Sequence, residues 1–322
     1  MDKEARIYVA GHRGLVGSAI VCELQRQGYG DILTASHDEL DLTNQTDTHT
    51  WFAKHRPDYV FLGAAKVGGI GANSTYPAQF IYDNLAIALN VIEAAYRTGV
   101  TKLCNLGSSC IYPRQCEQPM REEALLSGAL EPTNEPYAIA KIAAIKLCQS
   151  YNTQYATDFL SLMPTNLYGP QDTYDLENSH VLPALIARFH LAKKAGDTVV
   201  TLWGDGSPLR EFLYVDDLAQ AAVMLMQRYG AADIGSWINV GSGQEVAIGR
   251  LAHMVREIVY GGDASSFPTI RWDSSKPTGT PRKLLDSTRI NKLGWQAKTS
   301  LREGIEKTYR AYLQIHEMPE AR

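Results

Sequence analysis

Near its beginning the chain reads Ile7-Tyr8-Val9-Ala10-Gly11-His12-Arg13-Gly14-Leu15-Val16-Gly17. The first four residues predict a buried strand, and the spacing of Val16, Ile20 and Leu24 predicts a helix with one apolar face. Between them lies a G-x-x-G-x-x-G turn, where glycine lets the backbone approach a phosphate and the start of the helix offers free N–H groups. This strand-turn-helix unit predicts a dinucleotide site. The residues expected to hold the dinucleotide are Gly11, His12, Arg13, Gly14, Leu15, Val16 and Gly17.

The alternation of strands and helices continues through the first half of the chain. Further apolar strands are expected at residues 32–35, 59–63, 102–106 and 159–163, and helices at 77–98 and 137–155. Such alternation predicts an α/β fold of the Rossmann type, a doubly wound parallel sheet with right-handed crossovers. Beyond residue 164 this alternation of strands and helices is interrupted by loops that contain Pro and Gly. The helices expected in this part of the chain are 182–195, 215–227 and 301–313. We therefore expect a dinucleotide-binding domain over 1–165, to which 212–240 return, and a smaller C-terminal α/β substrate domain over 166–318.

The composition limits the partners that the protein can have. The chain has 322 residues, of which 45% are hydrophobic and 20% charged, as in globular proteins. Its formal charge of -4 provides no general positive field, so neither nucleic acid nor a membrane surface is expected as a partner. The five cysteines are scattered, without a C-x-x-C pair, which predicts no disulfide framework and no metal site. Without an apolar stretch long enough to cross a bilayer, the protein is expected to be cytoplasmic.

The end of the second strand should distinguish NADH from NADPH, because NAD-binding proteins place a carboxylate there against the ribose 2'-hydroxyl. This chain has Ser36 and His37 at that point, which leaves the strand end free of a carboxylate, and the next acid comes one residue later. Arg13 and His37 favour NADPH, since cations suit its 2'-phosphate, but both cofactors remain open. Asp41 and Leu42 are expected beside the adenine, with a helix-capping role for Asp41 as the alternative.

A Y-x-x-x-K pair, Tyr137 and Lys141, places a phenol and an ammonium one turn apart on a helical face. We expect the ammonium to lower the pKa of the phenol, which then exchanges a proton with a carbonyl oxygen while hydride moves to or from the attached carbon. Alone the pair fits an ordinary amphipathic helix equally well. Together with the glycine turn and the Ser108-Ser109 pair after a strand, it indicates an oxidoreductase.

Three further motifs carry a family resemblance: 164–170 (PTNLYGP), 210–217 (REFLYVDD) and 239–243 (NVGSG). With the turn and the Y-x-x-x-K pair, they make the chain similar to the extended short-chain dehydrogenase/reductase superfamily over nearly its whole length. Members usually act on nucleotide-activated sugars and commonly form dimers through two long helices, so the resemblance implies a homodimer that pairs residues 77–98 and 137–155. It also implies cofactor contacts at Leu106, Gly107, Lys141, Pro164, Asn166, Leu167 and His180.

Segments 65–70, 107–113, 131–136, 178–183 and 275–283 narrow the resemblance. They are similar to the branch that converts GDP-4-keto-6-deoxy-D-mannose to GDP-L-fucose with NADPH, by 3,5-epimerisation and 4-reduction. The resemblance implies that Cys110 is the base and His180 the acid of epimerisation, and that Ser108, Tyr137 and Lys141 serve reduction. The residues it places around the GDP group are Arg188, Trp203, Arg210 and Lys283.

Less specific interpretations of these residues stay open. Cys110 alone would fit a small core residue, and His180 alone a helix cap. The nearest alternative function is another sugar-nucleotide epimerase or dehydratase of the same superfamily. From a different class, the chain would be a dinucleotide-binding sensor without catalysis.

Overall fold

The computed structural model describes residues 1–176, 179–261, 264–275 and 280–316. The other positions, 177–178, 262–263, 276–279 and 317–322, are outside the described residues. Parts of three expectations therefore lie outside the described residues: position 178 of the segment 178–183, positions 276–279 of the segment 275–283, and the expected end of the second domain at 318.

A six-stranded parallel sheet forms the centre of the larger body, in the order β2-β1-β3-β4-β5-β9. Its strands are β1 (Ile7–Ala10), β2 (Ile32–Leu33), β3 (Tyr59–Leu62), β4 (Lys102–Leu106), β5 (Phe159–Pro164) and β9 (Trp237–Val240). The chain adds β2 on one side of β1 and β3 on the other, so the strand order reverses beside β1. Ligands of open α/β sheets bind at such a reversal, outside the carboxyl ends of the strands.

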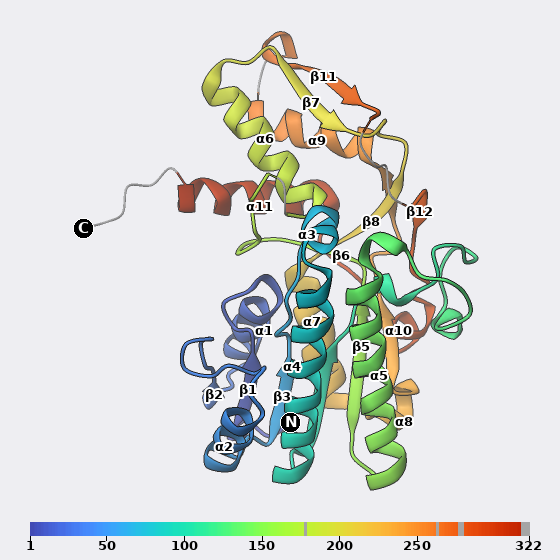
Figure 1. Ribbon diagram of the computed structural model, residues 1–322. Coiled ribbons are helices and arrows are strands. Elements are labelled where there is room, and N and C mark those ends of the chain that lie inside the picture. Colours follow the sequence, from blue (N-terminus) through green and yellow to red (C-terminus); the bar gives the residue numbers. More distant parts are fainter. Residues whose placement is uncertain (177–178, 262–263, 276–279, 317–322) are drawn as a thin grey trace.

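Helices cover both faces of this sheet, as the alternation predicted (Figure 1). Along β1, Ile7 and Val9 pack with α1 (Leu15–Arg26) and α7 (Val215–Arg228). Tyr8 and Ala10 point to the other face. That face is covered by α2 (Gln45–His55), α4 (Pro77–Thr98) and α5 (Glu135–Tyr155). The continuous burial of β1 reflects this two-sided covering.

Local signals fix several element ends. The predicted helix 77–98 is confirmed, with Pro77 in its first turn and Gly99 at its end in the left-handed region at φ 74°. The strand expected at 32–35 ends at Leu33 instead, because the chain turns at Ser36, whose backbone N–H bonds to the Glu39 side chain.

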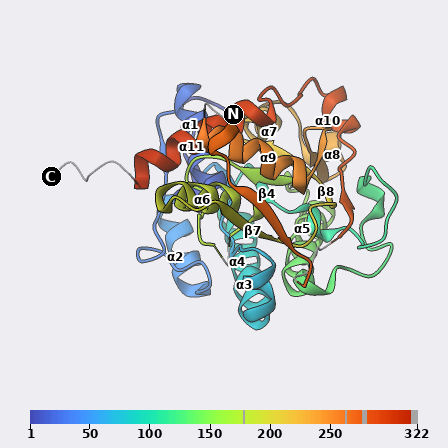
Figure 2. The same ribbon diagram turned by 90° about the horizontal axis from the view of Figure 1, so that it is seen from above.

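A second group of elements lies above the carboxyl edge of the sheet in Figure 1, and Figure 2 views it from above. Its four-stranded sheet contains β6 (Asn166–Tyr168), β8 (Leu209–Tyr214), β10 (Glu245–Ala247) and β12 (Arg282–Lys283). A two-stranded sheet pairs β7 (Val199–Trp203) with β11 (Thr269–Asp273). Around a core of its own lie α6 (Val181–Ala195), α9 (Ile248–Tyr260) and α11 (Leu301–His316). Residues 212–214 thus belong to this second group, whereas α7 and β9 join the larger body.

Short elements complete the described chain. They are α3 (Ile70–Thr75), α8 (Ala231–Ile234), α10 (Thr288–Lys292), η1 (Ser109–Ile111), η2 (Glu122–Ala124), η3 (Pro132–Asn134) and η4 (Ala264–Ser266). Within the residues described, no helix has the length and apolar character needed to cross a membrane.

Candidate active site

The glycine turn has the shape that a dinucleotide pyrophosphate requires. Gly11 adopts φ 79°, and the N–H of Gly14 donates to its carbonyl oxygen at 3.0 Å. A Cβ on Gly17 would lie 2.1 Å from the same oxygen, so only glycine lets α1 pack this close to the turn. At Gly14, which begins α1, a Cβ would meet that oxygen at an ordinary 3.5 Å. The turn therefore fits an anion at the helix start, beside the reversal of strand order.

The end of β2 differs from what the sequence led us to expect. The place is not free of a carboxylate, because Glu39 Oε2 accepts from the backbone N and the Oγ of Ser36, both at 2.7 Å. His37 is highly exposed, and its Nδ1 lies 3.9 Å from Asp41 Oδ1. The two hydrogen bonds from Ser36 lower the pKa of Glu39. The charge of Arg13, which is exposed on the neighbouring turn, lowers it further. The Arg13 guanidinium and the Glu39 carboxylate thus share this corner of the sheet.

The alternative role for Asp41 as a helix cap is wrong. Its Oδ1 accepts from the backbone N and Oγ1 of Thr43, at 2.9 and 2.7 Å, and so closes a local turn. Asn44 caps α2 instead, since its side chain accepts from the backbone N of Asp47. Leu42, the other residue expected beside the adenine, has its side chain buried in the core.

The predicted catalytic residues of the larger body meet where β4 ends. Lys141 Nζ, from α5, donates to the carbonyl oxygen of Leu106 at 2.7 Å and lies 5.7 Å from the centre of the Tyr137 ring. Ser108 Oγ accepts from the backbone N of Cys110 at 3.3 Å. The spacing of the Y-x-x-x-K pair is thereby confirmed as a shared helical face, pointed at the carboxyl end of β4.

Burial decides the protonation of this group. It raises the pKa of Tyr137 well above its usual value, and nearby Cys110 raises it further, so the expected lowering by Lys141 is wrong here. Burial likewise lowers the pKa of Lys141 to about 8. The pKa of the Cys110 thiol is raised by burial, while the positive charge of Lys283 opposes that rise. The phenol and the thiol are therefore neutral at neutral pH in this structure, and the charge of Lys283 favours the thiolate.

Two cations expected near the GDP group lie side by side. Lys283 pairs with Arg210 across β12 and β8, and burial lowers the pKa of each. Next to Arg210 along β8, the buried carboxylate of Glu211 accepts from the backbone N of Gly243 at 2.7 Å and of Leu285 at 3.0 Å. Glu211 thus holds β8, β12 and the 241–243 loop together.

The other expected substrate residues form a second group on α6 and β7. Arg188 lies with its guanidinium carbon 5.9 Å from the centre of the Trp203 ring, and its Nη2 donates to the carbonyl oxygen of Leu176. His180 begins α6, where solvent reaches it although protein atoms surround it closely, and this desolvation lowers its pKa. Among the described contacts, none joins His180 to Cys110.

Comparisons with known proteins agree with this arrangement. Residues 7–241 match the NAD dependent epimerase/dehydratase family. Over 312 residues the chain is 57% identical to GDP-L-fucose synthase 1 of Arabidopsis thaliana, covering 97% of this chain and 94% of the relative. It is 50% identical over 321 residues to GDP-L-fucose synthase of Escherichia coli K12, covering 98% of each. The chain belongs to the GDP-L-fucose synthase family.

A solved structure extends this likeness to three dimensions. The GDP-L-fucose synthetase of Naegleria fowleri bound to NADP superposes with a TM-score of 0.88 at 27% identity, covering 99% of this chain and 97% of that one. The family assignment agrees with the resemblance that the motifs predicted.

The remaining expected cofactor residues of this GDP-L-fucose synthase family member lie at the carboxyl ends of β4 and β5 and on β6, which follows β5 in the chain. Gly107 continues β4, and its N donates to the carbonyl oxygen of Leu162 at 2.8 Å. Pro164 ends β5. Asn166 donates from Nδ2 to the carbonyl oxygen of Glu211 at 2.8 Å, and Leu167 packs against the core.

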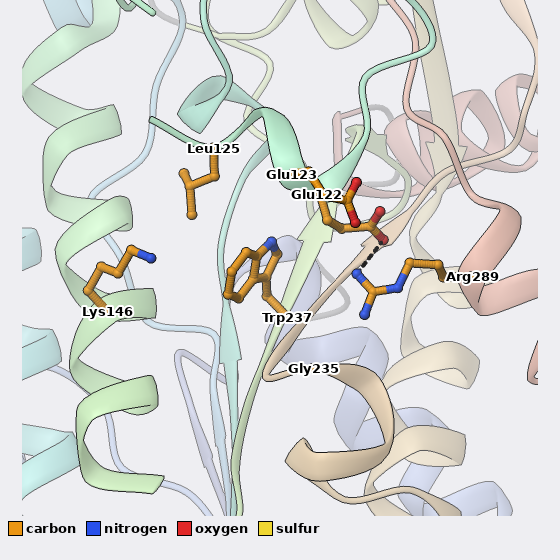
Figure 3. Close-up of a pocket in the computed structure, with 7 residues that line it drawn as sticks. All are labelled: Glu122, Glu123, Leu125, Lys146, Gly235, Trp237 and Arg289. Carbon is orange, nitrogen blue, oxygen red and sulfur yellow. Dashed lines mark ion pairs between the residues drawn. The ribbon is translucent and has the colours of Figure 1, made fainter. Parts of the chain in front are cut away.

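A pocket of about 370 Å³ lies elsewhere, at the outer edge of β9 (Figure 3). Trp237, at the start of β9, faces Lys146 of α5, whose Nζ lies 5.2 Å from the indole ring centre. Arg289 and the buried Glu122 form an ion pair at 3.6 Å on the opposite wall. Of the described residues that line it, none is a candidate catalytic or binding residue, so the volume of this pocket says nothing about the reaction.

Sequence reasoning missed two acids of the site. Glu39 sits at the cofactor corner and Glu211 at the junction of the two groups of elements. Glu39 could have been found, because Ser36 and Glu39 have the S-x-x-E spacing of a capping pair. Glu211 was inside a quoted motif, but its partners are distant in the chain and gave no local signal.

Proposed function

We propose that this protein is an NADPH-dependent 3,5-epimerase and 4-reductase that converts GDP-4-keto-6-deoxy-D-mannose to GDP-L-fucose. The observation that carries the proposal is one cluster at the end of β4, where Cys110 lies with Tyr137 and Lys141, at the same edge of the sheet as the glycine turn. A thiol suits proton abstraction from carbon, and a phenol suits proton transfer to a carbonyl oxygen.

Reduction requires a proton for the C4 oxygen of the sugar. The hydride for C4 would come from NADPH when it is bound. Tyr137 is neutral because burial raises its pKa, and a neutral phenol is the form that donates a proton to the new alkoxide. Lys141 donates one hydrogen bond to the Leu106 carbonyl oxygen. Its other N–H groups would hold the nicotinamide ribose, and Ser108 would donate to the C4 oxygen of the sugar.

Epimerisation requires a base and an acid on opposite faces of the sugar. The C4 ketone acidifies the hydrogens at C3 and C5. Cys110, as the thiolate, takes the proton from carbon as the electron pair moves toward the C4 oxygen, and His180, as the imidazolium, returns a proton to the other face. Before the second inversion Cys110 gives its proton up to solvent, and His180 takes one from it. Lys283 favours the thiolate that this step needs, and His180 regains its proton from solvent, which reaches it.

The binding of the GDP group is assigned to the four residues that the resemblance named. Arg210 and Lys283 supply adjacent cations for the diphosphate, and Arg188 supplies another. Trp203 offers an indole face for the guanine. In this proposal residues 1–165, with 215–240, form the dinucleotide domain, and the described residues from 166 to 316 otherwise form the substrate domain.

Two further properties belong to the proposal. A homodimer is favoured because α4 and α5 expose Tyr82 (69%), Leu89 (52%) and Ile139 (41%), which a second copy of the same helices would cover. Sedimentation as a monomer at micromolar concentration would contradict it. All five cysteines are free thiols, which supports a reducing compartment such as the cytoplasm.

The experiment mixes purified protein, GDP-4-keto-6-deoxy-D-mannose and NADPH, follows the absorbance of reduced cofactor and identifies the sugar. We expect one NADPH to be oxidised for each GDP-L-fucose formed. A related 4-epimerase or dehydratase recycles its nicotinamide within a turnover and would consume none. A non-catalytic sensor would bind NADPH and leave the sugar unchanged.

A further inference from the structure

A carboxylate is fixed at the carboxyl end of β2. Glu39 Oε2 accepts two hydrogen bonds from Ser36, from its backbone N and its Oγ, each at 2.7 Å. The backbone N of Glu39 donates back to the Ser36 carbonyl oxygen at 3.1 Å. Leu40 donates to the same oxygen at 2.9 Å and is buried in the core. The turn therefore holds the Glu39 carboxylate in one position.

This position adjoins the glycine turn. β1 and β2 are parallel neighbours, pairing Ile7 with Ile32 and Tyr8 with Leu33, so their carboxyl ends lie at the same edge of the sheet. The Ser36 turn leaves β2 there, and the glycine turn leaves β1. The Ser36 bonds, and then the charges of Arg13 and His12, lower the pKa of Glu39. A negative charge thus persists at neutral pH where the adenosine ribose of a dinucleotide lies.

We infer that Glu39 is a specificity-determining residue that limits the preference of the enzyme for NADPH over NADH. The inference rests on the proposed function, which supplies NADPH as the cofactor. The carboxylate occupies the N–H and O–H of Ser36, two donors that a 2'-phosphate at the strand end would otherwise use. It also repels that phosphate, so Arg13 must supply most of the attraction.

The neighbouring charges provide a matched comparison. Asp38 is an exposed acid in the same turn, adjacent in the chain to Glu39. The Asp41 carboxylate is engaged by Thr43 and lies 3.9 Å from His37. Glu39 differs from Asp38 because it is bonded to the buried Ser36 and is within reach of the Arg13 charge. Neutralising Glu39 and neutralising Asp38 change the net charge of the protein by the same amount. Only the loss of the Glu39 charge should strongly alter recognition of the 2'-phosphate.

The test measures dissociation constants for 2',5'-ADP and 5'-AMP by calorimetry, in wild type and in Glu39→Gln, Asp38→Asn and Ser36→Ala. Both Ser36 bonds go to one oxygen of Glu39, so the amide oxygen of glutamine accepts both and the turn is kept. We expect Glu39→Gln to bind 2',5'-ADP about three- to tenfold more tightly, with 5'-AMP unchanged and the gain reduced by added salt. Asp38→Asn should give a smaller gain, and Ser36→Ala none.

The outcomes separate this inference from the proposed function. If Glu39→Gln leaves the ratio of the two constants unchanged, or weakens both probes equally, Glu39 only holds the turn and the inference is overturned. An equal gain in Asp38→Asn would overturn it as well, since a general charge effect would explain both. Wild type alone tests the cofactor: failure to bind either probe would contradict the proposed function together with the inference.

Discussion

Gly17→Ala tests the packing that shapes the cofactor turn. The added Cβ would lie 2.1 Å from the Gly11 oxygen, 2.5 Å from its carbonyl carbon and 2.9 Å from the Cα of His12. All three are backbone atoms, so no side chain can rotate away, and α1 or the turn must move. Overpacking costs roughly 1–3 kcal/mol, and here we expect the upper end, about 3 kcal/mol or more, because backbone must shift. Alanine regains about 1 kcal/mol of helix propensity, which leaves a net loss of about 2 kcal/mol or more.

The assay is urea denaturation followed by circular dichroism, together with NADPH binding followed by fluorescence. Gly14→Ala is the matched control, because its Cβ would make only an ordinary 3.5 Å contact with the same oxygen. We expect the control to keep its unfolding midpoint and to bind NADPH more weakly, since the new methyl group faces the phosphates. Gly17→Ala should lose both stability and binding. A Gly17→Ala protein that unfolds at the wild-type urea concentration would refute the packing argument.

Other variants separate the roles of single residues. Tyr137→Phe should lose most reduction but still exchange solvent deuterium into the sugar, and equal loss of reduction and exchange would contradict the division of roles. Cys110→Ser should lose exchange and keep NADPH binding, and normal exchange in that variant would show Cys110 to be structural. Arg13→Ala should raise the dissociation constant of NADPH by at least about tenfold with little change for NADH, and an equal change for both would oppose the assigned contact. Asp172 has one carboxylate oxygen with no described partner, and burial raises its pKa from 3.8 to about 7. A pKa raised in the folded state makes the stability of the protein fall as pH rises from 4 to 7. Asp172→Asn should therefore raise the free energy of unfolding at pH 8 by about 1–3 kcal/mol and leave it unchanged at pH 4. Urea titrations at both pH values would show this.

Much of the fold followed from short-range signals. Helix α4 matched its expected range because a proline and a glycine mark its ends, and β1 with α1 followed from one glycine turn. Helix α9 was missed although Leu251, Val255 and Val259 are spaced four apart and are all buried. The segments on either side of α9 in the sequence are rich in loops, and for that reason the helical spacing of these residues was not recognised.

The site was less accessible to sequence reasoning where its chemistry depends on burial and distant pairs. The Y-x-x-x-K spacing placed Tyr137 and Lys141 together, yet it gave no account of burial, which raises the pKa of the phenol. Lys283 was expected beside the diphosphate, and its charge also acts on Cys110, which is far away in the chain. The contact between residues so far apart in the chain depends on the pairing of β12 with β8, which the local sequence pattern does not predict.

The central claim is that one site epimerises two carbons and reduces a third. The most direct measurement is the NMR spectrum of the product formed by the wild-type protein from GDP-4-keto-6-deoxy-D-mannose and NADPH in D₂O, with a sample lacking protein as control. The account predicts GDP-L-fucose that carries deuterium at C3 and C5, delivered from solvent by His180 after Cys110 has removed the original hydrogen, and protium at C4, from the cofactor. Protium retained at C3 and C5 in a reduced sugar would show a simple 4-reductase, and deuterium at C4 would contradict reduction by NADPH.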